Sequence, residues 1–143
     1  MSKTESESPD DYVNMTVAEV GFTDQVGLEG FLLLSSHDGR KFPIRAFSGE
    51  VAKHMDRFRK GDRSSIPTIY NLVEELADMN SIFLMAIDIY QTGDVLRANL
   101  HFQGRNGDFV LKHYRASDSI ALATFYDAPI RIPNKMLAWE ANK

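Results

Sequence analysis

Three short turn-forming segments constrain the fold of this chain most strongly, because each separates two runs of alternating apolar residues. Each has the composition of a hairpin turn and contains a glycine that can adopt a positive φ angle. The pattern predicts antiparallel pairing of 28–35 with 41–47, of 81–90 with 95–103, and of 95–103 with 108–114. A further strand is expected at 12–22, with an irregularity where its apolar phase slips. The turns are His37-Asp38-Gly39-Arg40, Gln91-Thr92-Gly93-Asp94 and Gly104-Arg105-Asn106-Gly107.

Helical periodicity replaces this alternation in two segments between the hairpins. Val51, Met55 and Phe58 are spaced i, i+4 and i+7, which predicts an amphipathic helix over 49–59. A second helix is expected after Pro67, where proline suits the first turn. Its apolar stripe and the acids expected to face solvent are Ile69, Leu72, Val73 and Leu76, and Glu74, Glu75 and Asp78.

The order of the predicted elements indicates an α+β fold. We expect an antiparallel or mixed β-sheet built of hairpins and packed with two or three helices, in a single domain over 12–143. A helix at 118–126, a strand at 129–132 and a terminal helix after Pro133 complete the pattern. Residues 1–11 carry one lysine against four acids and little apolar surface, so they are expected to form a disordered acidic tail.

Composition excludes several classes of function. The chain has no cysteine, which rules out disulfides and thiolate chemistry within it. Its longest apolar run, 82–87, is far shorter than the roughly 18 residues of a membrane-spanning helix. No membrane association and a cytoplasmic location are therefore expected. Most of the net charge of −4 lies in the first eleven residues, so the remaining chain is nearly neutral.

The segment from Arg115 to Ile130 joins a polar helix start to a short apolar helix and then to a strand. Ser117 is a suitable N-cap, and Asp118 in the first turn would face the positive end of the helix dipole. The simplest interpretation is that Arg115 pairs with Asp118. Pro129 ends the helical stretch.

Carboxylates and arginines are the best candidates for chemistry. Glu50 and Asp118 each begin a predicted helix, and packing could bring the two helix starts together. Mg²⁺ or Mn²⁺ needs only one or two protein carboxylates when a substrate phosphate supplies other ligands. Arg115 or Arg45 could then hold a phosphate by bidentate contacts. His101 and His113 could also face one another across their hairpin, although no third metal ligand is evident.

At the level of motifs, the chain resembles the bifunctional nuclease domain family over roughly residues 13–137. The segment Arg115-Ala116-Ser117-Asp118-Ser119-Ile120-Ala121-Leu122-Ala123, followed by Ala128-Pro129-Ile130, is similar to the family's Arg-Pro-Ser-Asp-Ala-Ile-Ala-Leu-Ala and Ala-Pro-Ile. A second element, Gly39-Arg40-Lys41-Phe42-Pro43-Ile44, resembles its Gly-x-x-Leu-Pro-Ile strand. Glu50 lies near the position of the family's Glu-Ala pair.

A third family element, Arg-Pro-Leu-Thr-His-Asp-Leu, aligns with 66–72, where Tyr70 stands in place of His and Asn71 in place of Asp. Either a catalytic pair has been lost, or the pair serves to cap a helix, in which case Asn can make similar hydrogen bonds.

The resemblance implies a metal-dependent nuclease acting on DNA or RNA and a homo-oligomeric assembly. The alternative is a noncatalytic oligomeric module that binds a protein, an anion or nucleic acid. Candidate catalytic residues are Asp118, Glu50 and Arg115, with Glu50 and Asp118 as metal ligands for Mg²⁺ or Mn²⁺. Candidate substrate-binding residues are Ser117, Arg45 and Arg40.

Overall fold

A computed structural model describes residues 11–141 of the chain. Seven strands form one sheet in the order β4-β3-β2-β8-β5-β6-β7. All neighbouring strands are antiparallel except β5 and β8, which are parallel. The predicted α+β class with a mixed sheet built of hairpins is confirmed. The strands are β2 (Tyr12–Phe22), β3 (Glu29–Ser36), β4 (Lys41–Ser48), β5 (Phe83–Thr92), β6 (Val95–Gly104), β7 (Gly107–Arg115) and β8 (Ile130–Pro133).

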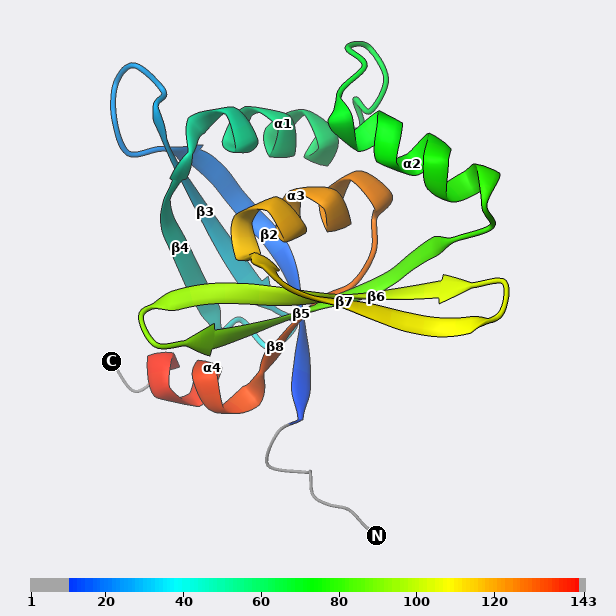
Figure 1. The fold of residues 1–143 in the computed structure, drawn as a ribbon. Coiled ribbons are helices and arrows are strands. Elements are labelled where there is room, and N and C mark those ends of the chain that lie inside the picture. Colours follow the sequence, from blue (N-terminus) through cyan, green and yellow to red (C-terminus); the bar gives the residue numbers. More distant parts are fainter. Residues whose placement is uncertain (1–10, 142–143) are drawn as a thin grey trace, which may run out of the picture.

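Among the described residues, four helices accompany the sheet, and each corresponds to a helical segment that the sequence predicts. They are α1 (Gly49–Arg59), α2 (Ile69–Met79), α3 (Ala116–Tyr126) and α4 (Asn134–Ala141). Figure 1 shows α1 and α3 side by side over one face of the sheet, with α2 outside them. The terminal helix α4 packs near β4 and β8. None of these helices, within residues 11–141, is long and apolar enough to cross a membrane.

The three predicted hairpin turns are all present. The turn at 104–107 pairs Gly104 with Gly107 and closes the β6–β7 hairpin. The irregularity expected in the first strand is also confirmed, because the register of β2 against β3 shifts between Val17 and Glu19. Strand β5 begins and ends two residues later than expected. Most of the expected acidic tail, residues 1–10, lies outside the described residues.

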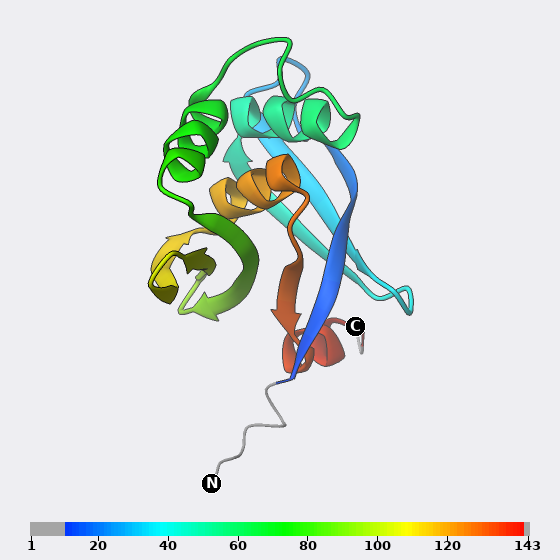
Figure 2. The same cartoon turned by 90° about the vertical axis from the view of Figure 1, so that its right-hand side faces the viewer.

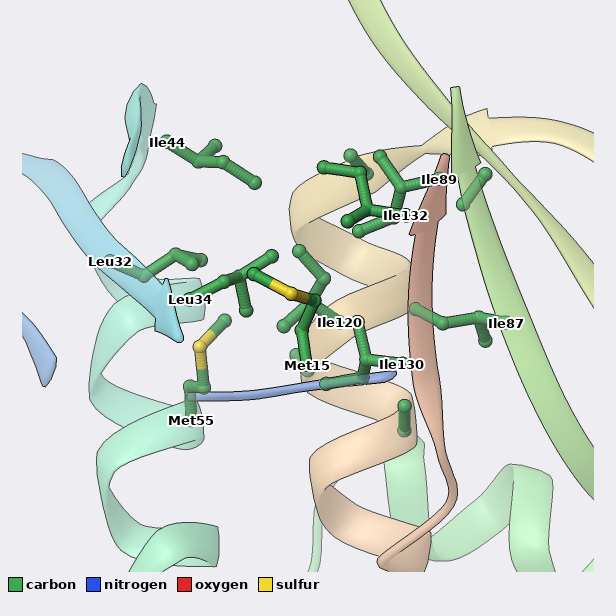
Figure 3. Close-up of a cluster of buried hydrophobic side chains, with 14 of the residues drawn as sticks. Met15, Leu32, Leu34, Ile44, Met55, Ile87, Ile89, Ile120, Ile130 and Ile132 are labelled. Carbon is green, nitrogen blue, oxygen red and sulfur yellow. The ribbon is translucent and has the colours of Figure 1, made fainter. Parts of the chain in front are cut away.

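The core lies between the sheet and the pair formed by α1 and α3. Met55 of α1 and Ile120 of α3 are fully buried against apolar side chains from five strands. Figure 3 shows these residues meeting between the two helices and the strands. Small residues in α3, including Ala121 and Ala123, bring its backbone close to the sheet. The strand residues of the cluster are Met15, Leu32, Leu34, Ile44, Ile87, Ile89, Ile130 and Ile132.

Helix α2 departs from the arrangement that its sequence suggests. It buries only Tyr70 and Ala77, and Figure 2 shows it standing at the outer side of α3 and β5. Its apolar stripe is exposed together with Glu75 and Asp78, with 48% of Leu72 and 53% of Leu76 accessible to solvent. Glu74, which the sequence also predicts to face solvent, is half-buried and pairs with Arg63. The stripe therefore contributes little to the core of a single chain.

Candidate functional site

The starts of α1 and α3 lie at the same end of the helix pair (Figure 1). Ser48 is the N-cap of α1, and its Oγ accepts a hydrogen bond of 3.2 Å from the amide of Glu50. The N-cap of α3 is Arg115, whose side chain does not cap the helix. The prediction that Ser117 is the N-cap is wrong: the helix begins at Ala116, and Ser117 is buried in its first turn.

A cavity of about 540 Å³ lies beside these two helix starts. Three arginines line it: Arg45 from β4, Arg97 from β6 and Arg115 from the end of β7. It therefore combines three cations with two helix N-termini, which favour anions through their amides and their dipole. The polar residues that complete its lining are Ser48, Asp94, Ser117 and Asp118.

Arg115 and Asp118 form the ion pair that the sequence predicts. Nε of Arg115 donates a hydrogen bond of 2.9 Å to Oδ2 of Asp118. The two side chains are 70% and 41% exposed. Both charged groups can therefore reach a ligand in the cavity.

Glu50 lies in the first turn of α1, two positions after Ser48, and does not line the cavity. Its charge and that of Asp118 both act on Tyr70 of α2. Burial raises the pKa of Tyr70 to about 12, and the negative charges of Asp118 and Glu50 act in the same direction, while Arg115 opposes them. Two carboxylates from different helices therefore act on one phenol, which remains neutral at physiological pH.

His54 lies beside Glu50 and Tyr70, although it does not line the cavity, and the sequence interpretation did not single it out. It lies one turn after Glu50, and its Nε2 is 3.7 Å from Oε2 of that residue. Its ring meets the ring of Tyr70 edge-on at 5.5 Å and stacks with Phe58 at 6.1 Å. The i, i+4 spacing of Glu50 and His54 was the available signal, since it puts both on one helix face. An imidazole is thus present next to Tyr70, which occupies the aligned His position of the resembled motif.

Asn71 has a structural role. Its Oδ1 accepts a hydrogen bond of 2.9 Å from the amide of Thr68, completing a capping box at the start of α2. Its Nδ2 donates to the carbonyl of Arg63 at 2.9 Å. The capping interpretation of this position therefore fits the chain, because Asn71 makes the bonds that hold α2 in place.

Other candidate residues lie away from the cavity. Arg40 binds Asp38 and Asn134 near the other end of β4, and it does not line the cavity with Arg45. His101 and His113 do not face one another. His101 binds Asp88 through Nε2 at 2.8 Å, and His113 binds Tyr90. Among the described residues, no group of three or more His, Cys, Asp or Glu is placed to hold a metal ion.

The structure thus places an arginine-lined cavity at the starts of two helices that pack on a mixed sheet. The family model of the bifunctional nuclease domain matches residues 32–143. The chain therefore belongs to the bifunctional nuclease domain family, as the motif resemblance predicted. No curated protein matches the chain significantly.

Proposed function

We propose that the protein is a metal-dependent nuclease that binds phosphodiesters of DNA or RNA in the cavity and hydrolyses them. The observation that carries the proposal is the cavity in which Arg45, Arg97 and Arg115 lie with Asp118 of α3, at the end of the helix pair where α1 begins. Membership of the bifunctional nuclease domain family supports it. The near-neutral charge of the chain outside its first eleven residues makes these local cations important for attracting a polyanion.

Arg45, Arg97 and Arg115 would hold the phosphate. A guanidinium donates two parallel hydrogen bonds to a phosphate and keeps its charge at all relevant pH values. Because the three arginines come from different strands, they can contact different oxygens of one phosphate or of neighbouring phosphates. Positive charge at this position would also stabilise the additional negative charge of the transition state.

Glu50 and Asp118 would hold Mg²⁺ or Mn²⁺. Their oxygen donors suit these cations, which commonly use one or two protein carboxylates together with substrate phosphate and water. Two carboxylates and no larger cluster among the described residues fit such a substrate-completed site better than a closed structural site. When bound, the cation would supply charge stabilisation at the phosphate oxygens.

His54 would accept the proton of the attacking water. The water oxygen forms a bond to phosphorus, the bond to the leaving oxygen breaks, and the water proton moves to Nε2 of His54. That nitrogen lies 3.7 Å from a carboxylate oxygen of Glu50, so the resulting imidazolium would form beside a negative charge. Imidazole is the side chain best suited to proton transfer near neutral pH, whereas Tyr70 stays protonated.

The test is hydrolysis of single-stranded DNA, duplex DNA and RNA by the purified protein with Mg²⁺ or Mn²⁺. Cleavage should stop with EDTA and fall at least about tenfold in Asp118→Asn and in His54→Gln. Asp56→Asn is a matched control, because Asp56 also forms an exposed ion pair, with Lys60, at the other end of α1. Activity equal in the wild type and Asp118→Asn would reject the proposal.

A second candidate is a noncatalytic module that binds nucleic acid or another phosphate-bearing anion. One observation favours it: Arg115 already occupies Oδ2 of Asp118, which reduces the capacity of that carboxylate to bind a metal. This module would be stabilised by oligonucleotides without hydrolysing them, and Arg97→Ala would abolish the stabilisation. Either activity on nucleic acid would be compatible with the predicted cytoplasmic location.

A further inference from the structure

One face of strands β5, β6 and β7 carries aromatic rings and a buried ion pair that the proposed hydrolysis does not use. Ile89 of β5 and Leu100 of β6 point into the core on the side of α3, which Figures 1 and 2 show above these strands. Successive side chains of a strand point to opposite faces, so their neighbours in the chain lie on the other face. We call this other face the outer face. Its residues are Asp88, Tyr90, Arg97, Asn99, His101, Lys112, His113 and Arg115.

Tyr90 and His113 form an aromatic pair that crosses the middle strand β6. Oη of Tyr90 and Nδ1 of His113 are hydrogen-bonded, and the two rings meet edge-on with centroids 6.0 Å apart. The register of β6 against β7 shifts between Ala98 and Leu100, and His113 lies at this irregularity with a φ of 73°. Its amide donates to Oδ1 of Asn99 at 3.2 Å. A left-handed non-glycine residue is uncommon, and here it turns the His113 ring toward Tyr90, as bulges can redirect side chains.

His101 adds a third ring, and a buried ion pair fixes its position. Nε2 of His101 lies 2.8 Å from Oδ2 of Asp88, which also binds Arg131 of β8. Asp88 is buried, whereas 34% of the His101 side chain is exposed. A ring that is already held through one nitrogen loses little further freedom when a ligand packs on it. The outer face thus presents one ring from each of three adjacent strands.

The outer face continues into the arginine cavity. The register places Arg97 directly opposite Tyr90 on one side and directly opposite Arg115 on the other. Both arginines line the cavity. Side chains on one face of a strand repeat about every 7 Å, so the row from Arg97 through Asn99 to His101 is about 13 Å long. A nucleic acid chain with one phosphate held by the arginines can therefore reach the rings with its neighbouring nucleotides.

Positive charge prevails on the outer face. Its acid, Asp88, is buried and bound by Arg131, so this negative charge is balanced within the protein. The two other aspartates of these hairpins, Asp94 and Asp108, lie at or next to the turns. A polyanion is therefore the ligand whose charge fits this face. The cations of the outer face are Arg97, Lys112 and Arg115.

We propose that the outer face binds a single strand of DNA or RNA, whose bases stack on the rings of Tyr90, His101 and His113 while a phosphate occupies the arginine cavity. The proposal rests on the proposed binding of phosphodiesters in that cavity, and it names the substrate class as single strands rather than duplexes. Unpaired bases offer their faces to Tyr and His rings, whereas the bases of a duplex are stacked on one another. Each nucleotide carries a phosphate and a base, which suits a surface that combines cations with rings.

Fluorescence anisotropy of the full chain with a labelled oligothymidine of about 12 nucleotides tests the proposal. The oligonucleotide is used alone and paired with its complement, in EDTA so that no strand is cleaved. The wild type should bind the single strand at least about tenfold more tightly than the duplex.

His101→Gln combined with His113→Asn removes two of the three rings. Gln can still donate a hydrogen bond to Asp88, and Asn tolerates the left-handed backbone at position 113. The double variant should bind the single strand at least about tenfold more weakly than the wild type, and the single strand and the duplex about equally. His113→Asn alone, at an exposed position, should show a smaller loss in the same direction. Circular dichroism checks that both variants are folded.

Phe109→Leu is the matched control, because it removes an exposed ring from the opposite face of β7, where Phe109 lies across from the buried Phe102. Its affinity for the single strand should stay within about twofold of the wild type. Equal affinity of the wild type for single strand and duplex would overturn the proposal. So would equal single-strand affinity in the wild type and the double variant, or an equal loss in Phe109→Leu.

Hydrolysis of bis(4-nitrophenyl) phosphate by the wild type with Mn²⁺ tests the nuclease function separately. This small diester has no nucleobase and requires only the cavity. Absence of its hydrolysis, together with single-strand binding that depends on the rings, would reject the nuclease function and leave the outer face as a binding site. Hydrolysis together with binding that does not depend on the rings would reject the outer face alone.

Discussion

Arg115, the N-cap residue of α3, donates from Nε to Oδ2 of Asp118 in the first turn of the helix at 2.9 Å. The pair spans three positions in the sequence and is largely exposed. Exposed pairs of this kind contribute between about 0 and 1 kcal/mol to folding. Its main consequence is therefore positional, because it fixes a guanidinium and a carboxylate beside the same cavity.

Asp118→Asn should separate stability from function. The free energy of unfolding, measured by urea denaturation, should change by less than about 1 kcal/mol because the lost pair is exposed. Hydrolysis, or binding of a short oligonucleotide, should fall at least about tenfold if Asp118 acts in the site. A loss of several kcal/mol in stability would instead show that the residue holds the start of α3.

Tyr70 should make stability depend on pH in the alkaline range. Burial and the charges of Asp118 and Glu50 raise its pKa from 10.0 to about 12 in the folded protein. The folded state therefore retains the phenolic proton where the unfolded state releases it. The stabilisation is complete below pH 10 and is lost as pH rises through about 12.

Comparison with Tyr70→Phe isolates this contribution. Between pH 10 and 11 the wild type should lose about 1 kcal/mol more unfolding free energy than the variant. Tyr126, whose pKa is also raised by burial, is present in both proteins and cancels in the difference. Parallel pH profiles of the two proteins would show that Tyr70 ionises normally.

Asn71→Ala should destabilise the protein through α2. It removes the bond accepted from the Thr68 amide and the bond donated to the Arg63 carbonyl, and loss of such a cap costs about 1 to 2 kcal/mol. Asn71→Asp keeps the acceptor and adds a favourable charge in the first turn of α2. It should therefore lower the free energy of unfolding less than Asn71→Ala does. The midpoints of urea denaturation should decrease in the order wild type, Asn71→Asp, Asn71→Ala. Equal losses in both variants would indicate that the bond to Arg63 dominates.

Local sequence patterns predicted most of the architecture, while the site depended on long-range placement. The hairpin at 104–107 and the helix at 49–59 follow from turn composition and i, i+4 spacing, which act between neighbours in the chain. The parallel pairing of β8 with β5 joins segments about forty residues apart, and no local signal specifies it. For the same reason Arg97 was missed, because only the position of β6 beside the α3 start brings it to the cavity.

The exposed stripe of α2 shows a different limit. An apolar stripe predicts that a helix buries that face against another element. The spacing of the residues from Ile69 to Leu76 is enough to predict such a stripe. The pattern is the same whether the partner lies in the same chain or in another. The sequence therefore identified the face but could not specify what covers it.

Gly49 should be among the least replaceable residues of the site. A Cβ added there would lie 1.9 Å from the carbonyl oxygen of Gly27, and the amide of Gly49 donates to the carbonyl of Leu28 at 2.9 Å. The start of α1 is thus pressed against the β2–β3 loop backbone, which has no flexible side chain that could move away. Gly49→Ala should cost about 2 to 4 kcal/mol in unfolding free energy.

Gly21→Ala is the matched control, because a Cβ at Gly21 meets nothing within 4 Å, and its effect should stay within about 0.5 kcal/mol. Gly49 also lies between Ser48, which lines the cavity, and Glu50. Displacement of α1 by Gly49→Ala should therefore weaken oligonucleotide binding in the fraction that remains folded, measured below the unfolding transition. Full stability with unchanged binding in Gly49→Ala would mean that the β2–β3 loop yields readily and does not position the site.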